Sequence, residues 1–453
     1  MLMKQKVSME IINLNAAGID VGSRSHFVAI GQGKNDIREF GVYNEDLSSI
    51  AEWLLANNVK TVAMESTGTY WQSLFAVLQN AGLQVILCNG KFTKNIKGKK
   101  TDVQDCQWIQ KLHTIGLLSG SFLPDEATEQ LRTYCRHRTN LLDNAADTTR
   151  KIQKYLRLLN LRLDVVVKDV VGLTGLLIIE AICKGETNAA VLASLRHGNC
   201  KKSEEEIAKA LQTNGRKDYL FALRHEYNMY RNLQSSIQDC DAEIEKMLTE
   251  QITDNDDKRQ HYIEKKAHKK INKNSPKNID INLMSYQYFE GIDLLAIEGV
   301  SHSTALTLMS EVGLQGLKKF DSAKQFASWL RLAPNNKISG GKVLSHKVPK
   351  GSNRLKIALR QAANVIGNLK NTPLSNFFNR INFRKGRSAA ISATARKLAV
   401  IIWNMIIKKQ PYNNDHGYEF LDQKRKRKVQ EMKKLIHKFD IKTEELGLLL
   451  TGL

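Results

Sequence analysis

Two short apolar runs near the N-terminus each carry an acidic residue at or near their end, and this pattern constrains the fold most. Asp20 lies inside the run Ala-Gly-Ile-Asp-Val-Gly, and Glu65 ends the run Thr-Val-Ala-Met-Glu. Short apolar runs bounded by turn residues are typical of buried β-strands. A carboxylate at the end of such a strand packs poorly, but it is well placed to hold a hard divalent cation such as Mg²⁺.

The elements around these runs predict an α/β domain. Two strand runs between Ala16 and Ile30 flank the turn Gly22-Ser-Arg-Ser, and a helix opens at Thr101, which forms a capping pattern with Gln104. The other expected elements are strands at 37–43, 59–64 and 85–88 and helices at 45–57 and 70–80. The resulting order, β-β-β-α-β-α-β and then a helix, is that of the RNase H-like fold.

Two further acids, Asp102 and Asp105, lie three residues apart and therefore on one face of the helix that opens at Thr101. Together with Asp20 and Glu65 they predict a metal site. Two Mg²⁺ ions roughly 3.5–4 Å apart can bind the attacking and leaving oxygens of a phosphodiester. Simpler explanations exist, since a first helical turn favours Asp102 through the helix dipole alone. A Glu at a strand end, such as Glu65, is often only solvated.

The charge of the chain favours a polyanionic partner. Its 453 residues carry a formal net charge of +22, and the pI is about 9.6. Nucleic acid would attract such a chain, as would an anionic membrane surface. We expect no transmembrane segment, because the longest uncharged apolar stretch, Val170–Ile179, is too short to span a bilayer. The N-terminus lacks a signal-peptide pattern, and six scattered cysteines without C-x-x-C spacing indicate reduced intracellular thiols.

The rest of the chain is expected to be mainly helical. A long helix from Glu126 to about Leu163 could contact nucleic acid through its basic face or pair with another helix. The stretch Glu204–Leu248 resumes a long helical pattern that could pair with it as an antiparallel coiled coil, and Val165–Ile182 predicts a helical cap. The predicted regions are 13–125 (RNase H-like), 126–252 (helical arms with an insert), 253–285 (polar basic linker), 286–410 (C-terminal helical domain) and 411–453 (basic helical tail).

The C-terminal domain opens with a segment, Leu294–Met309, that is similar to a helix-hairpin-helix motif. Such a hairpin can present backbone N–H groups and a helix N-terminus to a phosphate. This copy differs from the usual pattern, because Glu298 replaces a proline and Ser301 replaces the second glycine. A purely structural hairpin is the alternative.

The segment Leu332–Val343 places Ser339 before two glycines. Glycines allow another backbone to approach closely, and an activated serine can attack phosphorus. Ser-Gly-Gly is also an ordinary turn, and Ser345 and Ser352 are rival serines. A helix over Asn353–Leu369 is expected to turn Leu355, Ala358, Leu359, Ala362 and Ala363 inward and Arg354, Lys356 and Arg360 elsewhere. The residues expected to contact nucleic acid are Lys99, Lys100, Lys337, Lys342, Lys350, Arg354 and Arg360.

The chain resembles a family of bacterial insertion-sequence transposases. The motifs that carry the resemblance are GIDVGSRSHFVAI, MESTGTYW, NGKFTKNIKGKKTDVQD, IEGVSHSTALTLMSEVG and FASWLRLAPNNKISGGKVLSHKVPKGSNRLKIALRQAA, within residues 13–160 and 290–410. In that order they resemble the DEDD-class, bridge-RNA-guided recombinases of the "IS one-ten" family, in its "eleven-eleven" subgroup. The resemblance does not extend over the insert at about 165–285.

The resemblance implies roles for five residues. Asp20, Glu65, Asp102 and Asp105 would form the Mg²⁺-binding tetrad, and Ser339 would be the nucleophile that links to DNA. The C-terminal region would then be a serine transposase domain. The resemblance further implies a homo-dimer or tetramer whose active site joins the acids of one subunit to the serine of another.

The expected function is therefore that of a DNA transposase or recombinase in the cytoplasm of a bacterium, associated with the nucleoid. Its partners would be donor DNA, target DNA and a bridge (guide) RNA, with Mg²⁺ as cofactor and no membrane. Two alternatives remain open. One is a metal-dependent junction resolvase that hydrolyses DNA with water, in which Ser339 is only a turn residue. The other is a non-catalytic RNA-binding protein.

Overall fold

The computed structural model describes residues 10–90, 101–253, 271–277, 279–345, 347–351, 353–413 and 420–441. The chain divides into two compact units, Met1–Leu123 and Pro124–Leu453. The first unit is a mixed α/β fold, and the second is mostly helical.

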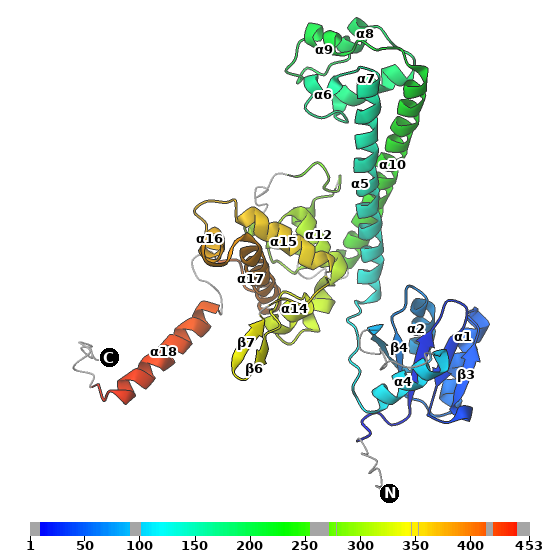
Figure 1. The fold of residues 1–453 in the computed structure, drawn as a ribbon, viewed down its shortest axis with the longest axis vertical. Coiled ribbons are helices and arrows are strands. Elements are labelled where there is room, and N and C mark those ends of the chain that lie inside the picture. Colours follow the sequence, from blue (N-terminus) through cyan, green and yellow to red (C-terminus); the bar gives the residue numbers. More distant parts are fainter. Residues whose placement is uncertain are drawn as a thin grey trace. The chain divides into compact units, whose positions relative to one another are not determined.

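The first unit is built on one five-stranded sheet of order β3-β2-β1-β4-β5 (Figure 1). Strands β1, β2 and β3 pair antiparallel, whereas β1, β4 and β5 run parallel. The elements are β1 (Ala16–Val21), β2 (His26–Ala29), η1 (Lys34–Asp36), β3 (Ile37–Phe40), α1 (Asn44–Ala56), β4 (Thr61–Glu65), α2 (Trp71–Asn80), β5 (Gln84–Cys88) and α4 (Asp102–Thr114). The predicted order of strands and helices is confirmed, with element ends that differ by a few residues.

The two faces of this sheet are covered by different helices. Ile19 and Met64 belong to the large apolar core that α1 and α2 contribute on one face. Because side chains alternate along a strand, their neighbours Gly18 and Ala63 lie on the other face. There α4 covers the sheet, and Ile109 packs with Ala63. The side chain of Thr101 accepts a hydrogen bond from the backbone N–H of Gln104 (3.3 Å), so the predicted start of α4 is confirmed.

Helix α4 lies unusually close to β1, and Gly18 makes this approach possible. A Cβ atom at position 18 would lie 2.6 Å from the carbonyl oxygen of Cys106 and closer still to the backbone nitrogen of Gln110. The Gln110 side chain donates to the carbonyl oxygen of Ala16 (3.2 Å), and His113 bonds to the hydroxyl of Thr61 (2.9 Å). These contacts fix α4 across β1 and β4.

We predict that Gly18→Ala lowers the free energy of unfolding of the first unit by about 1–3 kcal/mol, because overpacking forces α4 away from the sheet. Urea unfolding of the full chain, with hydrogen exchange of the α4 amides as the local readout, measures this. Gly120→Ala is the matched control, since its added Cβ would make only an ordinary contact of 3.6 Å with Ile86. Equal stability of the two variants would contradict this account of the packing.

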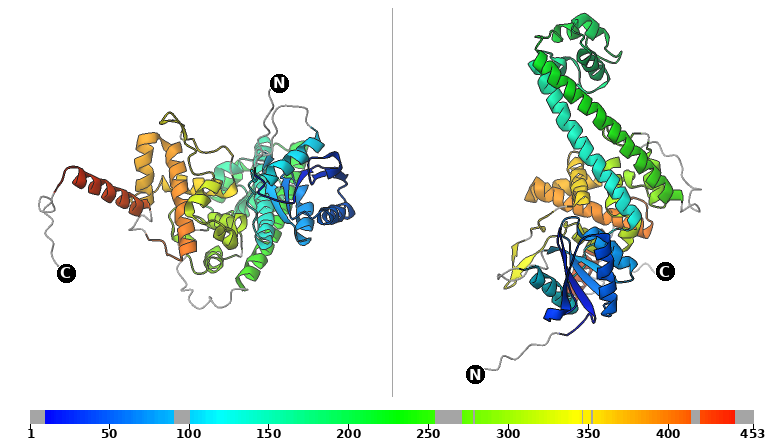
Figure 2. Two further views of the ribbon diagram at one scale, coloured as in Figure 1. Left: turned by 90° about the horizontal axis from the view of Figure 1, so that it is seen from below. Right: turned by 90° about the vertical axis from the view of Figure 1, so that its right-hand side faces the viewer.

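The second unit begins with a two-helix arm. Helices α5 (Glu126–Leu158) and α10 (Lys217–Thr253) run side by side in opposite directions, as Figures 1 and 2 show. The end of the arm where α5 ends and α10 begins carries a cap of short helices. The apolar core of this cap continues along both arm helices. The cap consists of α6 (Leu163–Val166), α7 (Leu173–Cys183), α8 (Ala189–Ser194) and α9 (Glu204–Ala210).

The prediction of one continuous helix over Glu204–Leu248 was wrong. The chain breaks between α9 and α10, where Gly215 adopts a positive φ of 69°. The backbone N–H of Asn214 donates to the carbonyl oxygen of Leu159 (3.1 Å), which ties the break to the end of α5. Helix α9 therefore belongs to the cap, and only α10 pairs with α5.

The sequence left two roles open for the cations of α5, contact with nucleic acid and pairing with another helix. In the structure these cations mainly form ion pairs within the protein. Arg136 donates to both carboxylate oxygens of Glu311 (2.8 and 2.7 Å), and Arg132 donates to the Glu311 backbone carbonyl (2.7 Å). Arg138 is buried and pairs with Asp241 of α10. These contacts favour the helix-pairing role for this part of α5.

The C-terminal part of the second unit packs around α17. Its elements are α11 (Ile281–Tyr288), η3 (Leu294–Ala296), α12 (His302–Glu311), α13 (Gly313–Lys318), α14 (Ala323–Trp329), β6 (Lys337–Ser339), β7 (Lys342–Ser345), α15 (Arg354–Ile366), α16 (Pro373–Lys385), α17 (Arg387–Lys408) and α18 (Phe420–Lys438). Helix α11 starts within the region predicted as linker, and most of that region, residues 254–270, lies outside the described residues.

The predicted helix-hairpin-helix differs from the expected motif. Its first element is only the three-residue turn η3, and Gly299 (φ 77°) faces α15 so closely that a Cβ would lie 2.6 Å from the carbonyl oxygen of Ala362. Glu298 accepts a hydrogen bond from Tyr412. The hairpin therefore packs against the protein, as the structural alternative requires.

Helix α17 is, among the described residues, the one helix long and apolar enough to cross a membrane. Within the 18-residue window that passes this test, 61% is buried inside the protein. It packs against α14, α15 and α16, as the core helix of a folded domain does.

Candidate functional site

The first unit brings Asp20 and Glu65 to the same edge of the sheet. The last printed pair of the parallel β1–β4 register is Ile19 with Met64, so the next residues, Asp20 and Glu65, lie side by side at the ends of adjacent strands. Neighbours in register point to the same face of a sheet. That face is the one covered by α4, because it is also the face of Gly18.

Helix α4 carries the other two predicted ligands, Asp102 and Asp105. Asp105 is half-buried and precedes Cys106, whose thiol lies near both Asp20 and Asp105. Burial, together with the nearby Asp20 and Asp105 carboxylates, raises the pKa of Cys106 to about 12. Asp102 lies one turn earlier and is exposed. Asp20 and Asp105 therefore lie near the same thiol, although they belong to different elements.

Glu65 is held at the end of β4 beside β5. Its register partner is Cys88, whose pKa is raised to about 11 by burial and by the Glu65 carboxylate. The carboxylate also occupies the space where a Cβ of Gly90 would project. A side chain at position 90 would therefore displace the Glu65 carboxylate.

These acids fit a hard divalent cation in their donor chemistry, because carboxylate oxygens are its preferred ligands. In the described part of the chain, however, no three Asp, Glu, His or Cys side chains converge closely enough to hold a metal ion. Among the described residues, the four carboxylates therefore do not form a closed ligand set. The predicted contacts Lys99 and Lys100 lie outside the described residues.

Ser339 lies in the second unit, at the tip of a two-stranded hairpin. Strands β6 and β7 pair antiparallel, with Ser339 opposite Lys342, and Gly340 and Gly341 form the turn with φ of 53° and 75°. Two residues with positive φ are what a type I′ hairpin turn requires. A Cβ on either glycine would meet nothing within 4 Å, so the turn backbone is open to an approaching strand.

The Ser339 side chain is exposed and makes no hydrogen bond with any other described residue. The hairpin alone therefore does not activate the hydroxyl. The rival Ser345 is half-buried and accepts a hydrogen bond from the Lys347 backbone N–H (3.2 Å). Ser352, the other rival, lies outside the described residues.

The predicted cations around the hairpin divide into two groups. Lys337, Lys342 and Lys350 are exposed, whereas Arg354 and Arg360 are half-buried on α15. Arg360 donates to the hydroxyl of Ser392 on α17 (2.6 Å), which holds its guanidinium near the protein surface. The exposed lysines are free to contact a phosphate backbone, and Arg360 also has a packing role.

Lys356 was expected on the outer side of α15, but it is buried, with 6% of its surface exposed. Its ammonium donates to the carbonyl oxygen of Gly351 (3.0 Å), and Arg331 donates to that of Lys350 (2.6 Å). Burial lowers the pKa of Lys356, and the nearby Arg360 and Arg331 lower it further. The helical pattern could not reveal this cluster, because Arg331 comes from a distant segment.

We predict that Lys356→Met does not lower the melting temperature of the free protein, because the substitution removes a buried positive charge that lies near two other cations. Because the folded pKa of Lys356 is lowered, its charge destabilises the fold at neutral pH. This cost disappears as pH rises toward the ordinary lysine value. The stability difference between variant and wild type should therefore shrink between pH 7 and pH 10.

Thermal melts of variant and wild type across this pH range measure the effect. Lys324→Met, at an exposed position of α14, is the control for stability. If Lys356→Met is clearly less stable than wild type by the same amount at every pH, the prediction is wrong and Lys356 stabilises the fold through its contacts.

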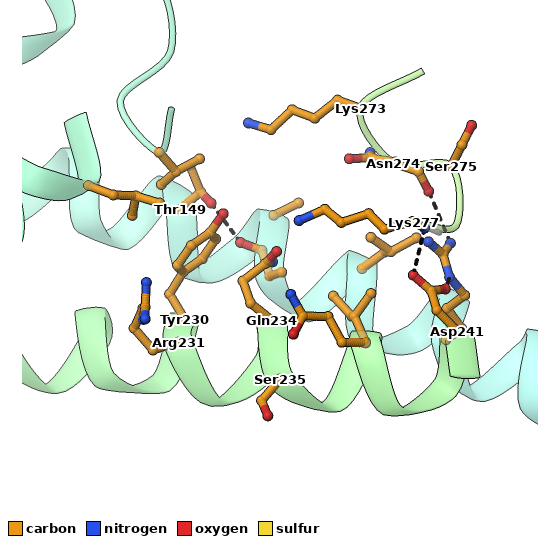
Figure 3. A pocket seen from close by; sticks show the side chains of 18 of the residues that line it. Thr149, Tyr230, Arg231, Gln234, Ser235, Asp241, Lys273, Asn274, Ser275 and Lys277 are labelled. Carbon is orange, nitrogen blue, oxygen red and sulfur yellow. Dashed lines mark hydrogen bonds and ion pairs between the residues drawn. The ribbon is translucent and has the colours of Figure 1, made fainter. Parts of the chain in front are cut away.

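Sequence reasoning also missed a groove between the arm helices and residues 271–277, here called the strap (Figure 3). The groove has a volume of about 670 Å³. In Figure 3 the side chains of Lys273 and Lys277 extend from the strap over the groove, toward its Tyr230 end. Arg138 and Asp241 line it at the other end, and Arg138 donates to the carbonyl oxygen of Asn274 (3.0 Å).

Both carboxylates of this groove are already paired. Asp241 pairs with Arg138 and accepts from the Lys277 backbone N–H (3.0 Å), and Asp169 pairs with Lys273. The buried Arg138–Asp241 pair joins the two arm helices, and its bonds to the Asn274 carbonyl oxygen and the Lys277 backbone N–H connect the strap to the arm. The groove contains none of the predicted catalytic residues.

Comparison with known protein families adds two matches. Residues 17–160 match the family model of DEDD transposases of IS110 elements, which is described as a transposase. Residues 293–378 match a second model, described as the transposase IS116/IS110/IS902 family. No curated protein matches the chain. All four acids fall inside the first matched segment, and Ser339 falls inside the second.

Proposed function

We propose that this chain, which carries two transposase domains of the IS110 family, moves a mobile insertion sequence by cutting and rejoining DNA through Mg²⁺-assisted attack by Ser339. The first domain would be an RNase H-like fold with Asp20, Glu65, Asp102 and Asp105 as the metal-binding tetrad. The transposase family itself implies DNA substrates. The proposal also assigns Ser339 as the nucleophile, Mg²⁺ as the cofactor and a guide RNA as a partner.

The observation that supports it most is the arrangement of carboxylates around α4. Asp20 and Glu65 end adjacent parallel strands, and Asp105 on α4 lies near the same Cys106 thiol as Asp20. Such a gathering of acids at a sheet edge is poorly suited to packing and well suited to a hard cation. Ser339, exposed at a tight hairpin turn with Lys337 and Lys342 on the same two strands, supports the second half of the proposal.

In the proposed reaction the Ser339 oxygen attacks phosphorus in the DNA backbone. A bond between the serine oxygen and phosphorus forms while one bond from phosphorus to a deoxyribose oxygen breaks. The serine gives up its proton to solvent, and the departing sugar oxygen takes one up. Mg²⁺, when held by the four acids, would polarise the phosphate and favour ionisation of the attacking hydroxyl.

The residues of the hairpin have roles in the same step. Lys337 and Lys342 flank Ser339 and would neutralise charge on the phosphate, while Gly340 and Gly341 leave room for the strand. The ester to Ser339 keeps the energy of the broken bond. A second strand end can then displace the serine and rejoin DNA without a high-energy cofactor.

We further propose that the active form is a homo-dimer or tetramer in which acids and serine from different subunits act together. Sequence choice would come from a bridge RNA paired with donor and target DNA. The charge of +22 supports a partner with a phosphate backbone.

The first test is a denaturing gel of labelled junction DNA with Mg²⁺. We expect wild type to form a denaturant-stable protein–DNA adduct, and Ser339→Ala to form none, because the attacking oxygen is gone. Asp20→Asn and Asp102→Asn should also abolish cleavage, by about 100-fold or more, because removing a stabiliser of transition-state charge has effects of that order. EDTA should have the same effect on wild type.

Ser345→Ala is the control on the same hairpin. An adduct that survives Ser339→Ala but disappears with Ser345→Ala would move the nucleophile. Cleaved ends without any adduct in wild type would favour the alternative function, a metal-dependent resolvase that uses water. Normal recombination by both acid variants would reject the tetrad.

The second test concerns the RNA. Purified protein is expected to retain a specific RNA encoded by its own element, and binding should weaken as salt rises because counterions are released from the phosphates. Sequencing of co-purified RNA at increasing salt measures this. Recovery of only a random mixture of cellular RNA would reject guidance by RNA, and the adduct assay would be unaffected.

A further inference from the structure

Phe383 is the most exposed large apolar side chain in the described part of the chain, with 93% of its surface exposed. The other two phenylalanines of α16 are covered. Phe378 is buried, and Phe377 lies 4.6 Å from the ammonium of Lys397 and 5.8 Å from the guanidinium of Arg380. Phe383 has no ring or cation contact with any described residue. Its ring is therefore not packed against the part of the chain that the structure describes.

The ring is carried on a rigid support. Helix α16 connects to α17 through the single residue Gly386, whose φ of 80° requires glycine. At the start of α17, Arg387 donates to the side-chain oxygens of Asn364 (2.8 Å) and Asn368 (2.9 Å) near the end of α15. Helices α16 and α17 pack against each other. Phe383 thus projects from a fixed helix end, three residues before the turn.

The surroundings of Phe383 are strongly cationic. Arg380, Arg384, Lys385 and Arg387 lie within four residues of it. More broadly, the sequence from Ser322 to Asn414 contains 18 lysines and arginines and no aspartate or glutamate. This segment therefore supplies +18 of the net charge of +22. Such a field attracts an anionic partner.

The partner must offer both negative charge and a flat apolar face. Nucleic acid offers both, since phosphates surround bases whose faces stack on aromatic rings. An anionic membrane would also attract the cations, but binding there needs a wide apolar surface. The residues next to Phe383 on the exposed end of α16 are polar or charged, namely Asn379, Asn382, Arg384 and Lys385.

We infer that Phe383 stacks on an unpaired nucleobase of the nucleic acid that lies along the basic α16–α17 hairpin. The inference rests on the proposed function, because it takes nucleic acid as the substrate. The ring would hold an unstacked base where the strands are opened, while the arginines and lysines bind the adjoining phosphates. A rigid ring loses little conformational entropy on stacking, which suits it to this role.

The test uses the full chain and fluorescence anisotropy with four labelled probes. These are single-stranded DNA, the matched duplex, a duplex with an unpaired bulge, and single-stranded RNA. Phe383→Ala should weaken binding to probes with unpaired bases by about 5–150-fold and to the duplex much less. Phe383→Trp should retain binding, and Phe383→Leu should behave like Phe383→Ala, because leucine has no π-face.

The salt dependence separates stacking from charge. Phe383→Ala should leave the slope of log affinity against log salt unchanged, whereas Arg384→Gln should reduce it by about 0.7–0.9. The melting temperature of Phe383→Ala should equal that of wild type, because the ring has no contacts to lose. The DNA and RNA arms then show which strand supplies the base.

Several results would overturn the inference. These are wild-type affinity of Phe383→Ala for all probes, full rescue by Phe383→Leu, a smaller oligomer of Phe383→Ala in light scattering, or a loss of binding to anionic vesicles alone. The same binding assay is repeated in an Asp20→Asn background, which should not cleave DNA, so that binding is measured independently of catalysis. Loss of cleavage with intact Phe383-dependent binding supports both proposals, whereas absence of any DNA cleavage by wild type leaves the stacking result standing.

Discussion

The close approach of α4 to β1 is the contact on which the candidate site depends. Two of the four acids end strands of the sheet and two belong to the helix, so they can share an edge only if the helix lies directly on those strands. Gly18 permits this because it has no side chain between the two backbones. Gln110 and His113 then fix the helix in place through bonds to Ala16 and Thr61.

The second unit separates structural charges from charges that face outward. In the arm, Arg136 and Arg138 are matched by Glu311 and Asp241, so the charges there hold helices together. Around the Ser339 hairpin, Lys337, Lys342 and Lys350 face outward. Nearby, Lys356 is buried close to Arg331 and Arg360 in a segment with no acid. A buried cation without a carboxylate is unfavourable in the free protein. Binding of phosphate would offset that cost.

Local patterns predicted much of this molecule. The strand and helix order of the first unit, the capped start of α4 at Thr101 and the turn after Ser339 follow from runs of a few residues, and each is present in the structure. The acids were identified as a group for the same reason, because each belongs to a short recognisable run. Their arrangement around one helix depends on long-range packing at Gly18, which no local run encodes.

What the sequence did not predict involves partners far apart in the chain. The break before α10 is fixed by Leu159, and the burial of Lys356 depends on residues that a helical pattern does not include. The exposure of Phe383, like the burial of Lys356, could not be predicted from the local sequence. By composition it resembles Phe377 and Phe378, and only the folded hairpin shows that two of these rings are covered and one is not. Exposure of a large apolar ring lowers the solubility of a free protein, so its position amid cations at a rigid helix end is more readily explained by a bound nucleobase than by packing.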